Sequence, residues 1–165
     1  MKKIILLFGL FVSFTATIYA QGSLEVGNYQ LNGGFGFSGW GIPVYVGVDY
    51  GIAEDFTVGG EISYRSDSHK NVSYSGLGIM ANGNYHFNRV LRIPSEFDVY
   101  AGATVGYFHW SHNNNHPYLE SYHSSGLGWG LQVGGRYFFN DNFGVNLELG
   151  GGNVVSGKLG ITYIF

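Results

Sequence analysis

Apolar and polar side chains alternate along most of this chain with a period of two residues. Such a period places successive side chains on opposite faces of an extended strand, whereas a helix repeats about every 3.6 residues. Eight alternating segments follow one another: Gly27–Phe37, Ile42–Ile52, Phe56–Arg65, Val72–Phe87, Phe97–Trp110, Ser124–Phe139, Phe143–Gly152 and Gly157–Phe165. Each has about the length of a tilted strand that crosses a lipid bilayer.

In every segment one face is apolar and the other carries glycine, polar or charged residues. In the sixth, Leu127, Trp129 and Leu131 alternate with Gly128 and Gly130. An open sheet leaves unpaired backbone groups at its edges, which lipid cannot satisfy, whereas a closed barrel pairs them all. The pattern therefore predicts an all-β fold: an eight-stranded antiparallel up-and-down transmembrane β-barrel, whose even number of strands returns the chain to its starting side.

Aromatic residues recur at one end of these segments, next to the short connections. They are Tyr50, Phe56, Phe87, Phe97, Tyr137, Phe139, Phe143, Tyr163 and Phe165. Aromatic girdles mark the membrane–water interfaces of β-barrels. We expect these residues to form the girdle at the periplasmic interface, with short turns on that side and longer polar loops on the other.

The last segment ends the chain on an aromatic residue. Leu159, Ile161, Tyr163 and Phe165 occupy every second position. This strand resembles the sorting signal of outer-membrane β-barrels, which has a terminal phenylalanine and alternating aromatic and apolar residues before it. The resemblance implies that the barrel-assembly machinery recognises the strand ending at Phe165, and that this strand closes the barrel against the first one.

The N-terminus has a different pattern. Two lysines precede an apolar run from Ile4 to about Val12, and Ala20 follows a mixed stretch. This order is typical of a secretory signal peptide. The apolar core is well short of the roughly 20 residues that a membrane-spanning helix needs. We expect residues 1–20 to be a cleaved signal peptide and residues 21–165 to form one outer-membrane β-barrel domain.

Composition narrows the class further. The chain of 165 residues holds 28 glycines, 18% aromatic residues and only 12% charged residues. Disordered chains are poor in aromatic residues, and beyond the N-terminus no apolar run is long enough for a spanning helix. The net charge of −3 and the lack of a basic stripe exclude nucleic-acid binding. Without cysteine, the chain has neither disulfides nor thiol chemistry.

Four internal motifs and the terminal strand carry a resemblance to a known family. The internal motifs are Asp49–Gly59, Asn84–Asn88, Phe97–Gly102 and Gly134–Phe139. Beyond the signal peptide the chain resembles the small eight-stranded OmpA/OmpX-type barrels, and most closely a family of outer-membrane β-barrel proteins. The resemblance implies a monomer in the outer membrane of a Gram-negative cell, in contact with outer-membrane lipid and lipopolysaccharide. It also implies a structural or surface-interaction role, without enzymatic activity or a cofactor.

Charged residues also fall on the inward faces of the predicted strands. They are Asp49, Glu61, Arg65, Asp98, Arg136, Glu148 and Lys158. Counting from the short turns places four of them, Glu61, Arg136, Glu148 and Lys158, at middle depth as a lumenal charge cluster. An eight-stranded barrel is just wide enough for its own side chains, and an unpaired buried charge is costly. We expect a lumen plugged by ion pairs, with a narrow ion or small-solute pore gated by these charges as the alternative.

Histidines gather in and beside the predicted outer loops. They are His69, His109, His112, His116 and His123. Several histidines in one coordination sphere can bind a metal ion. Their spacing matches no standard metal motif, so we expect these histidines to be polar loop residues that form no metal site.

His109, Ser111 and Glu120 raise an enzymatic alternative. The order His-x-Ser with a later Glu resembles the outer-membrane lipid A deacylase, which is another eight-stranded barrel. In that resemblance Ser111 is the nucleophile, His109 the base and Glu120 the group that orients the base. The motif lies near the C-terminal end of that family, whereas three predicted strands follow it here, and Glu120 falls in a loop. We therefore favour a protein that is not an enzyme.

Overall fold

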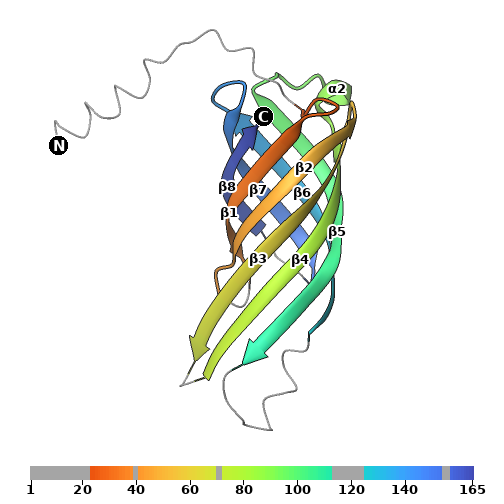
Figure 1. Cartoon of the computed structure of the whole chain (residues 1–165). Helices are drawn as coiled ribbons and strands as arrows, with labels where there is room; N and C mark the ends of the chain where they lie inside the picture. The colour runs from red at the N-terminus through yellow and green to blue at the C-terminus, as the bar shows by residue number, and fades with distance from the viewer. Residues whose placement is uncertain (1–22, 39–40, 70–71, 113–124, 154–156) are drawn as a thin grey trace, which may run out of the picture.

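The computed structural model describes residues 23–38, 41–69, 72–112, 125–153 and 157–165. In this part of the chain, antiparallel strands form one closed barrel in which each strand pairs with its sequence neighbours and β8 pairs with β1 (Figure 1). The strands are β1 Tyr29–Phe37, β2 Val44–Ala53, β3 Phe56–His69, β4 Val72–His86, β5 Phe97–His112, β6 Gly126–Phe138, β7 Phe143–Gly152 and β8 Gly157–Ile164. The predicted fold class is confirmed, and the predicted signal peptide lies outside the described residues.

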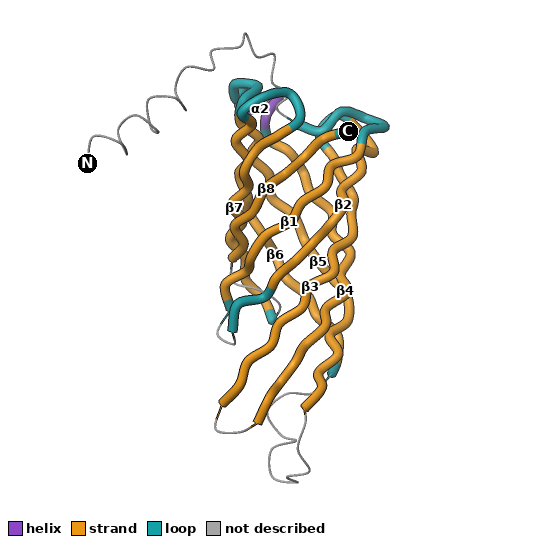
Figure 2. Tube along the Cα trace, turned by 60° about the vertical axis from the view of Figure 1, so that its left-hand side comes forward, coloured by secondary structure: helices purple, strands orange, loops and turns teal. Residues whose placement is uncertain are grey.

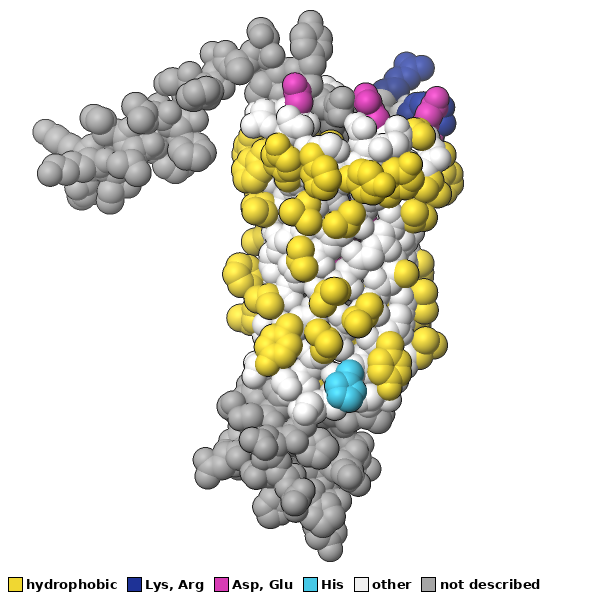
Figure 3. All heavy atoms as spheres, viewed as in Figure 1, with side chains coloured by type: hydrophobic (Ala, Val, Ile, Leu, Met, Phe, Trp, Pro, Cys, Tyr) yellow, Lys and Arg dark blue, Asp and Glu magenta, His cyan; other side chains and the backbone are white. Residues whose placement is uncertain are grey.

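The barrel wall separates apolar side chains outside from polar side chains inside. On β6, Trp129 and Leu131 are 53% and 64% exposed, whereas Gln132 and Arg136 are 7% and 4% exposed. On the face in view, Figure 3 shows hydrophobic side chains spread over the outer wall and Asp, Glu, Lys and Arg side chains at one end. This is the inverse of a water-soluble barrel, and it confirms the predicted outward and inward faces.

The two ends of the barrel carry different connections. At the end called the turn end, the connections are residues 54–55, 87–96 and 139–142, and the chain finishes at Phe165. At the opposite end, called the loop end, the connections are residues 38–43, 70–71, 113–125 and 153–156. Figure 1 shows the C-terminus and α2 together at the turn end.

Aromatic side chains gather at the turn end, where Figure 3 shows a band of hydrophobic side chains across the face in view. The ring of Tyr29 lies 4.8 Å from that of Tyr50 and 6.2 Å from that of Phe165, between centroids. Further ring pairs at this end are Phe56–Tyr85, Tyr85–Phe87, Phe97–Tyr137, Tyr137–Phe139, Phe139–Phe143 and Tyr163–Phe165. Since such a band marks a membrane–water interface, it fixes one edge of the apolar belt.

The segment before β1 closes the turn end from within. Leu24 packs with Phe138 of β6 and Ile164 of β8, and none of the three is more than 3% exposed. The backbone of this segment passes so close to Gly51 of β2 that any side chain at that position would collide with it. We call these three side chains the Leu24 seal. They form a buried apolar cluster inside the barrel at its turn end.

The longest connection at the turn end contains α2, a single helical turn over Asn88–Leu91. The side-chain amide of Asn88 bonds to the backbone of β5 through both its nitrogen and its oxygen. Arg89 forms ion pairs with Glu54 and Asp55 of the β2–β3 connection. The hydrogen bond to Asp55 raises the pKa of Arg89, so the guanidinium stays charged and both ion pairs persist. No helix among the described residues is long and apolar enough to cross a membrane.

Strands β3, β4 and β5 extend beyond the rest of the barrel at the loop end (Figures 1 and 2). The β2–β3 pairing stops where Val44 faces Tyr64, but β3 continues along β4 until His69 faces Val72. On the other side, β5 continues along β4 to His112 after its pairing with β6 has ended. We call this three-stranded extension, residues 65–69, 72–76 and 109–112, the projecting sheet.

The predicted strand ends in this region are wrong. The alternation predicted that β3 ends at Arg65 and that a polar loop begins at Ser66, and it ended β5 at Trp110. Residues 66–69 instead stay in the β3–β4 ladder, and β5 reaches His112. The reason is that hydrophobic alternation reports contact with lipid, whereas the backbone ladder continues where both faces of a sheet meet water.

Candidate functional site

Arg136 of β6 is the centre of a buried ionic group on the turn side of the lumen. Its two terminal nitrogens lie 3.1 Å from Asp49 Oδ2 on β2 and 2.6 Å from Asp98 Oδ2 on β5. All three side chains are at most 5% exposed. We call these residues the Arg136 group. One guanidinium therefore holds two carboxylates from opposite parts of the wall, which suits its forked geometry.

His86 extends the Arg136 group toward Thr57. His86 Nδ1 lies 2.7 Å from Asp98 Oδ1, and its Nε2 lies 3.0 Å from the Thr57 hydroxyl. Because a carboxylate only accepts, Nδ1–H donates to Asp98, and Nε2 forms a hydrogen bond with the Thr57 hydroxyl. The order hydroxyl–imidazole–carboxylate also occurs in hydrolytic triads. Here the hydroxyl is only 2% exposed, so this arrangement serves to fix Asp98 and offers no attack site.

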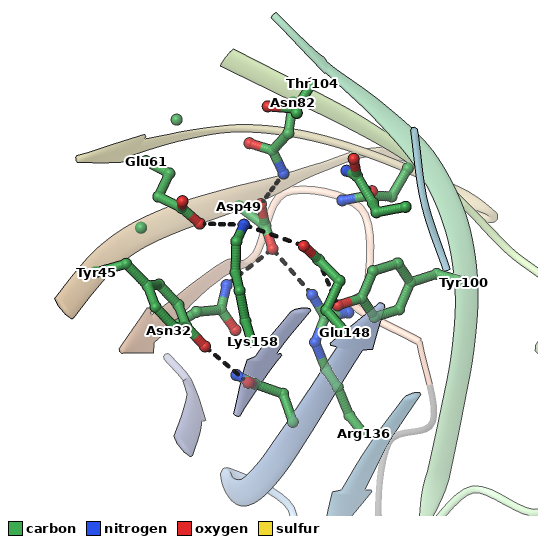
Figure 4. Close-up of a pocket in the computed structure, with 15 residues that line it drawn as sticks. Asn32, Tyr45, Asp49, Glu61, Asn82, Tyr100, Thr104, Arg136, Glu148 and Lys158 are labelled. Atoms are coloured by element: carbon green, nitrogen blue, oxygen red, sulfur yellow. Dashed lines mark hydrogen bonds and ion pairs between the residues drawn. The ribbon is translucent and has the colours of Figure 1, made fainter. Parts of the chain in front are cut away.

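A second ionic group lies around Lys158 of β8 (Figure 4). Lys158 Nζ is 2.7 Å from Glu61 Oε2 on β3 and 3.0 Å from Glu148 Oε1 on β7. These side chains are 14–16% exposed, so water reaches them more readily than the Arg136 group. We call them the Lys158 group. One cation again contacts two carboxylates.

Tyr100 joins the two ionic groups. Its hydroxyl donates to Glu148 Oε2 at 3.0 Å, and the Arg136 guanidinium carbon stands 4.2 Å from the centre of its ring. The position opposite on β6 is Gly134, where a β-carbon would fall 2.2 Å from the Tyr100 ring. Gly134 therefore leaves room for the Tyr100 ring. This ring stacks against the Arg136 guanidinium, and its hydroxyl orients the Glu148 carboxylate.

A small cavity separates the two ionic groups. Its volume is about 30 Å³, and amide and hydroxyl side chains line it together with the charged residues (Figure 4). A space of this size holds one or two water molecules. Among the described residues, every buried side-chain nitrogen and oxygen has a hydrogen-bond partner within the protein. The polar side chains around this cavity are thus bonded to one another, and the cavity has room for isolated water.

Large side chains fill the lumen toward the loop end. Met80 and Phe108 are 4% and 7% exposed and occupy the space left by Gly78, Gly106 and Gly128. Beyond them, the guanidinium carbon of Arg65 lies 5.2 Å from the ring centre of Phe108 and 5.5 Å from that of Trp110. This side chain also donates to Ser38 Oγ at 3.2 Å. The residues Met80, Phe108, Arg65 and Trp110 form the outer closure.

The structure divides the predicted charge cluster between the two ionic groups. Glu61, Glu148 and Lys158 meet as expected from their depth. Arg136 instead pairs with Asp49 and Asp98, and touches the other group only through Tyr100. In the sequence, Asp49 and Asp98 are inward charges outside the predicted cluster, and no pattern assigns a role to His86.

The candidates in the outer loops give no assembled site in the described part of the chain. His109 and Ser111 are both exposed on the outer face of β5, two residues apart. Glu120, His116 and His123 lie outside the described residues, and so do the side chains of His69 and His112. Among the residues that are described, no group of three metal-ligating side chains occurs.

A closed barrel with an apolar wall, an aromatic band and an ion-paired core is a transmembrane β-barrel. The chain belongs to the family described as "Outer membrane protein beta-barrel domain", whose model matches residues 8–161. It is therefore a protein of the outer membrane. Short turns of such barrels face the periplasm, so the turn end is periplasmic and the loop end faces outward. No curated protein matches the chain in sequence.

Solved structures share the fold at low sequence identity. OprG from Pseudomonas aeruginosa has a TM-score of 0.64 and 14% identity, covering 88% of this chain and 99% of OprG. The N-terminal barrel domain of OprF from the same organism has a TM-score of 0.56 and 19% identity, covering 86% and 100%. Ail from Yersinia pestis has a TM-score of 0.54 and 15% identity, covering 84% and 99%. At these identities the similarity establishes the fold alone.

Proposed function

We propose that this protein is a barrel with a closed lumen that acts at the outer cell surface, and that it is not an enzyme. The observation that carries the proposal is the continuous filling of the lumen. From the periplasm outward it holds the Leu24 seal, the Arg136 group, the Lys158 group and the outer closure. The internal cavity of about 30 Å³ is far too small for a solute path. The barrel then serves as a rigid membrane support for its outer surface.

The alternative is a narrow pore gated by the lumenal charges, and conductance separates the two. We expect the wild-type protein in planar lipid bilayers to give no discrete channel openings, because both ends of the lumen are closed by packed side chains. Insertion is checked independently by the shift in gel mobility on boiling. Openings in the wild type that change in size in Glu61→Gln, but not in the matched periplasmic variant Glu54→Gln, would establish the pore and end the proposal.

The projecting sheet is the feature that fits a surface role. Its outer β3 edge continues for five residues beyond the pairing with β2, or about 17 Å of strand. An edge strand presents backbone donors and acceptors that another molecule can pair with. Such a structure outside the lipid adds nothing to anchoring in the membrane. We infer that it contacts material at the cell surface, such as the sugars of lipopolysaccharide or of another cell.

One structural relative fits this role. Ail is the attachment invasion locus protein of Yersinia pestis, and one of its structures, with a TM-score of 0.50, is a complex with the heparin analogue sucrose octasulfate. That ligand is a property of Ail. For the present chain it supports choosing a sulfated glycan as the first probe of adhesion.

Shortening the projecting sheet tests the surface role. Arg65 faces Gly76 directly, so residues 66–75 can be replaced by an Asn-Gly turn that joins the two strands. We expect this variant to fold and to keep its heat-dependent gel mobility, while adhesion of cells displaying it to a heparin-coated surface falls to the level of cells without the protein. Equal adhesion of wild-type and shortened protein, or wild-type adhesion no higher than background, would contradict the role.

A further inference from the structure

An apolar groove crosses the outer wall over the seam where the barrel closes. It lies on β1 and β8 and reaches the adjoining faces of β2 and β7, with a volume of about 730 Å³. Its floor is Gly33, which faces Val46 of β2 on one side and Ile161 of β8 on the other. Because Gly33 has no side chain, the wall is hollowed between neighbours that stand 50% and 54% exposed.

The chemistry of the groove points to a hydrocarbon chain. Leu31, Phe35 and Leu159 complete its sides, and no charged residue lines it. Phe35 lines the groove and is 59% exposed. A second barrel is convex and would touch this wall along a line, whereas a flexible acyl chain can follow a groove. The protein lies in the outer membrane, so lipid acyl chains surround this surface.

The position of the groove identifies the leaflet. One end lies at Tyr163, whose ring stacks with that of Phe165 in the periplasmic aromatic band. Gly33 is four residues along β1 from Tyr29 of the same band, or about 10 Å of depth at a rise of about 3.4 Å per residue and a tilt of about 40°. The groove therefore begins at the periplasmic headgroup level and ends near the middle of the bilayer.

We propose that this groove is a binding site for one phospholipid of the periplasmic leaflet, whose acyl chain lies over Gly33 and covers the β1–β8 seam. Tyr163 and the adjoining aromatic band stand at the level of its glycerol and headgroup. Bound there, the lipid fills a hollow that the protein leaves in its own wall and adds dispersion contacts to both strands of the closing pair.

Filling the groove from the protein side tests the proposal. A β-carbon at position 33 would meet only one ordinary contact, 3.5 Å from Tyr45 O, so Gly33→Leu fits the fold and occupies the groove. The protein is reconstituted in nanodiscs of phosphatidylethanolamine and phosphatidylglycerol and released for native mass spectrometry. We expect the wild type to retain one phospholipid and Gly33→Leu to lose it.

Two further variants make the result specific. Gly135→Leu places the same side chain on the outer face of β6, where a β-carbon meets only Asp98 O at 3.8 Å, and should retain the lipid. Val46→Trp fills the groove from β2 and should lose it, which covers the case in which Gly33→Leu does not fold. Equal lipid retention by the wild type and the groove variants overturns the proposal. So does a wild-type dimer that Gly33→Leu abolishes, because it identifies a second copy as the occupant.

Discussion

Replacing Arg136 with methionine is expected to lower the free energy of unfolding by about 3–5 kcal/mol, the usual cost of removing one partner from a buried ionic group. Arg136 forms ion pairs with both Asp49 and Asp98, which are 3% and 1% exposed. Methionine fills much of the same volume without a charge. The change therefore leaves two carboxylates in the core of the barrel without the guanidinium that pairs with both of them.

Their other partners reduce this cost without removing it. Asp49 accepts hydrogen bonds from the amides of Asn32 and Asn82, at 2.9 and 2.8 Å, and Asp98 keeps His86. Neutral amides stabilise a carboxylate less than a guanidinium does. Protonation of one acid, or entry of water from the cavity, is the remaining way for the variant to relieve the charge.

Urea unfolding of the barrel in detergent micelles measures this effect. The matched control is Arg92→Met on the exposed periplasmic connection, which should change stability by no more than about 0.5 kcal/mol. The triple variant Asp49→Asn, Asp98→Asn, Arg136→Met removes all three charges and should recover most of the loss. An Arg136→Met barrel that unfolds at the wild-type urea concentration would show that the pairing contributes no net stability.

The faces of this barrel could be predicted from sequence because each side chain's environment follows from its parity along the strand. Leu131 must meet lipid if Gln132 meets the lumen, and this holds for every strand inside the membrane. The ends of β3 and β5 could not be predicted in this way. Beyond the lipid, both faces of the sheet meet water, and the alternation that marked the strand disappears.

The ion pairs divide in the same manner into local and distant ones. Asp98 faces Arg136 across the β5–β6 pair, and Glu148 faces Lys158 across β7–β8, so both follow from the register of neighbouring strands. The pairs Asp49–Arg136 and Glu61–Lys158 join strands that are not neighbours. Such contacts across the lumen depend on strand tilt and stagger, which one sequence does not reveal.

The Leu24 seal shows the same limit. Leu24 and Val26 are the two apolar residues between Gln21 and the first strand, and nothing in that short stretch marks Leu24 rather than Val26 as part of a core. Its burial follows from tertiary structure: Gly51 leaves room for the passing backbone, and Phe138 and Ile164 offer an apolar surface. A single apolar residue in a connection therefore carries no signal that sequence analysis can separate from chance.

Replacing Lys158 with methionine should lower the free energy of unfolding by about 1–3 kcal/mol, which is less than the loss at Arg136. Glu61 and Glu148 then face each other without the ammonium that lies 2.7 and 3.0 Å from them. The loss is smaller because these acids are 14–16% exposed and Glu148 keeps its hydrogen bond from Tyr100. Urea unfolding under the same conditions gives the comparison.

A charge-neutral version separates repulsion from lost packing. Glu61→Gln, Glu148→Gln, Lys158→Met removes the three charges together and should unfold close to the wild type, because uncharged groups of similar volume often replace a buried ion pair at little cost. If it is as unstable as Lys158→Met alone, the lysine acts through the packing of its stem against Tyr45, whose ring centre is 5.4 Å from Nζ, and the ionic account of this group fails.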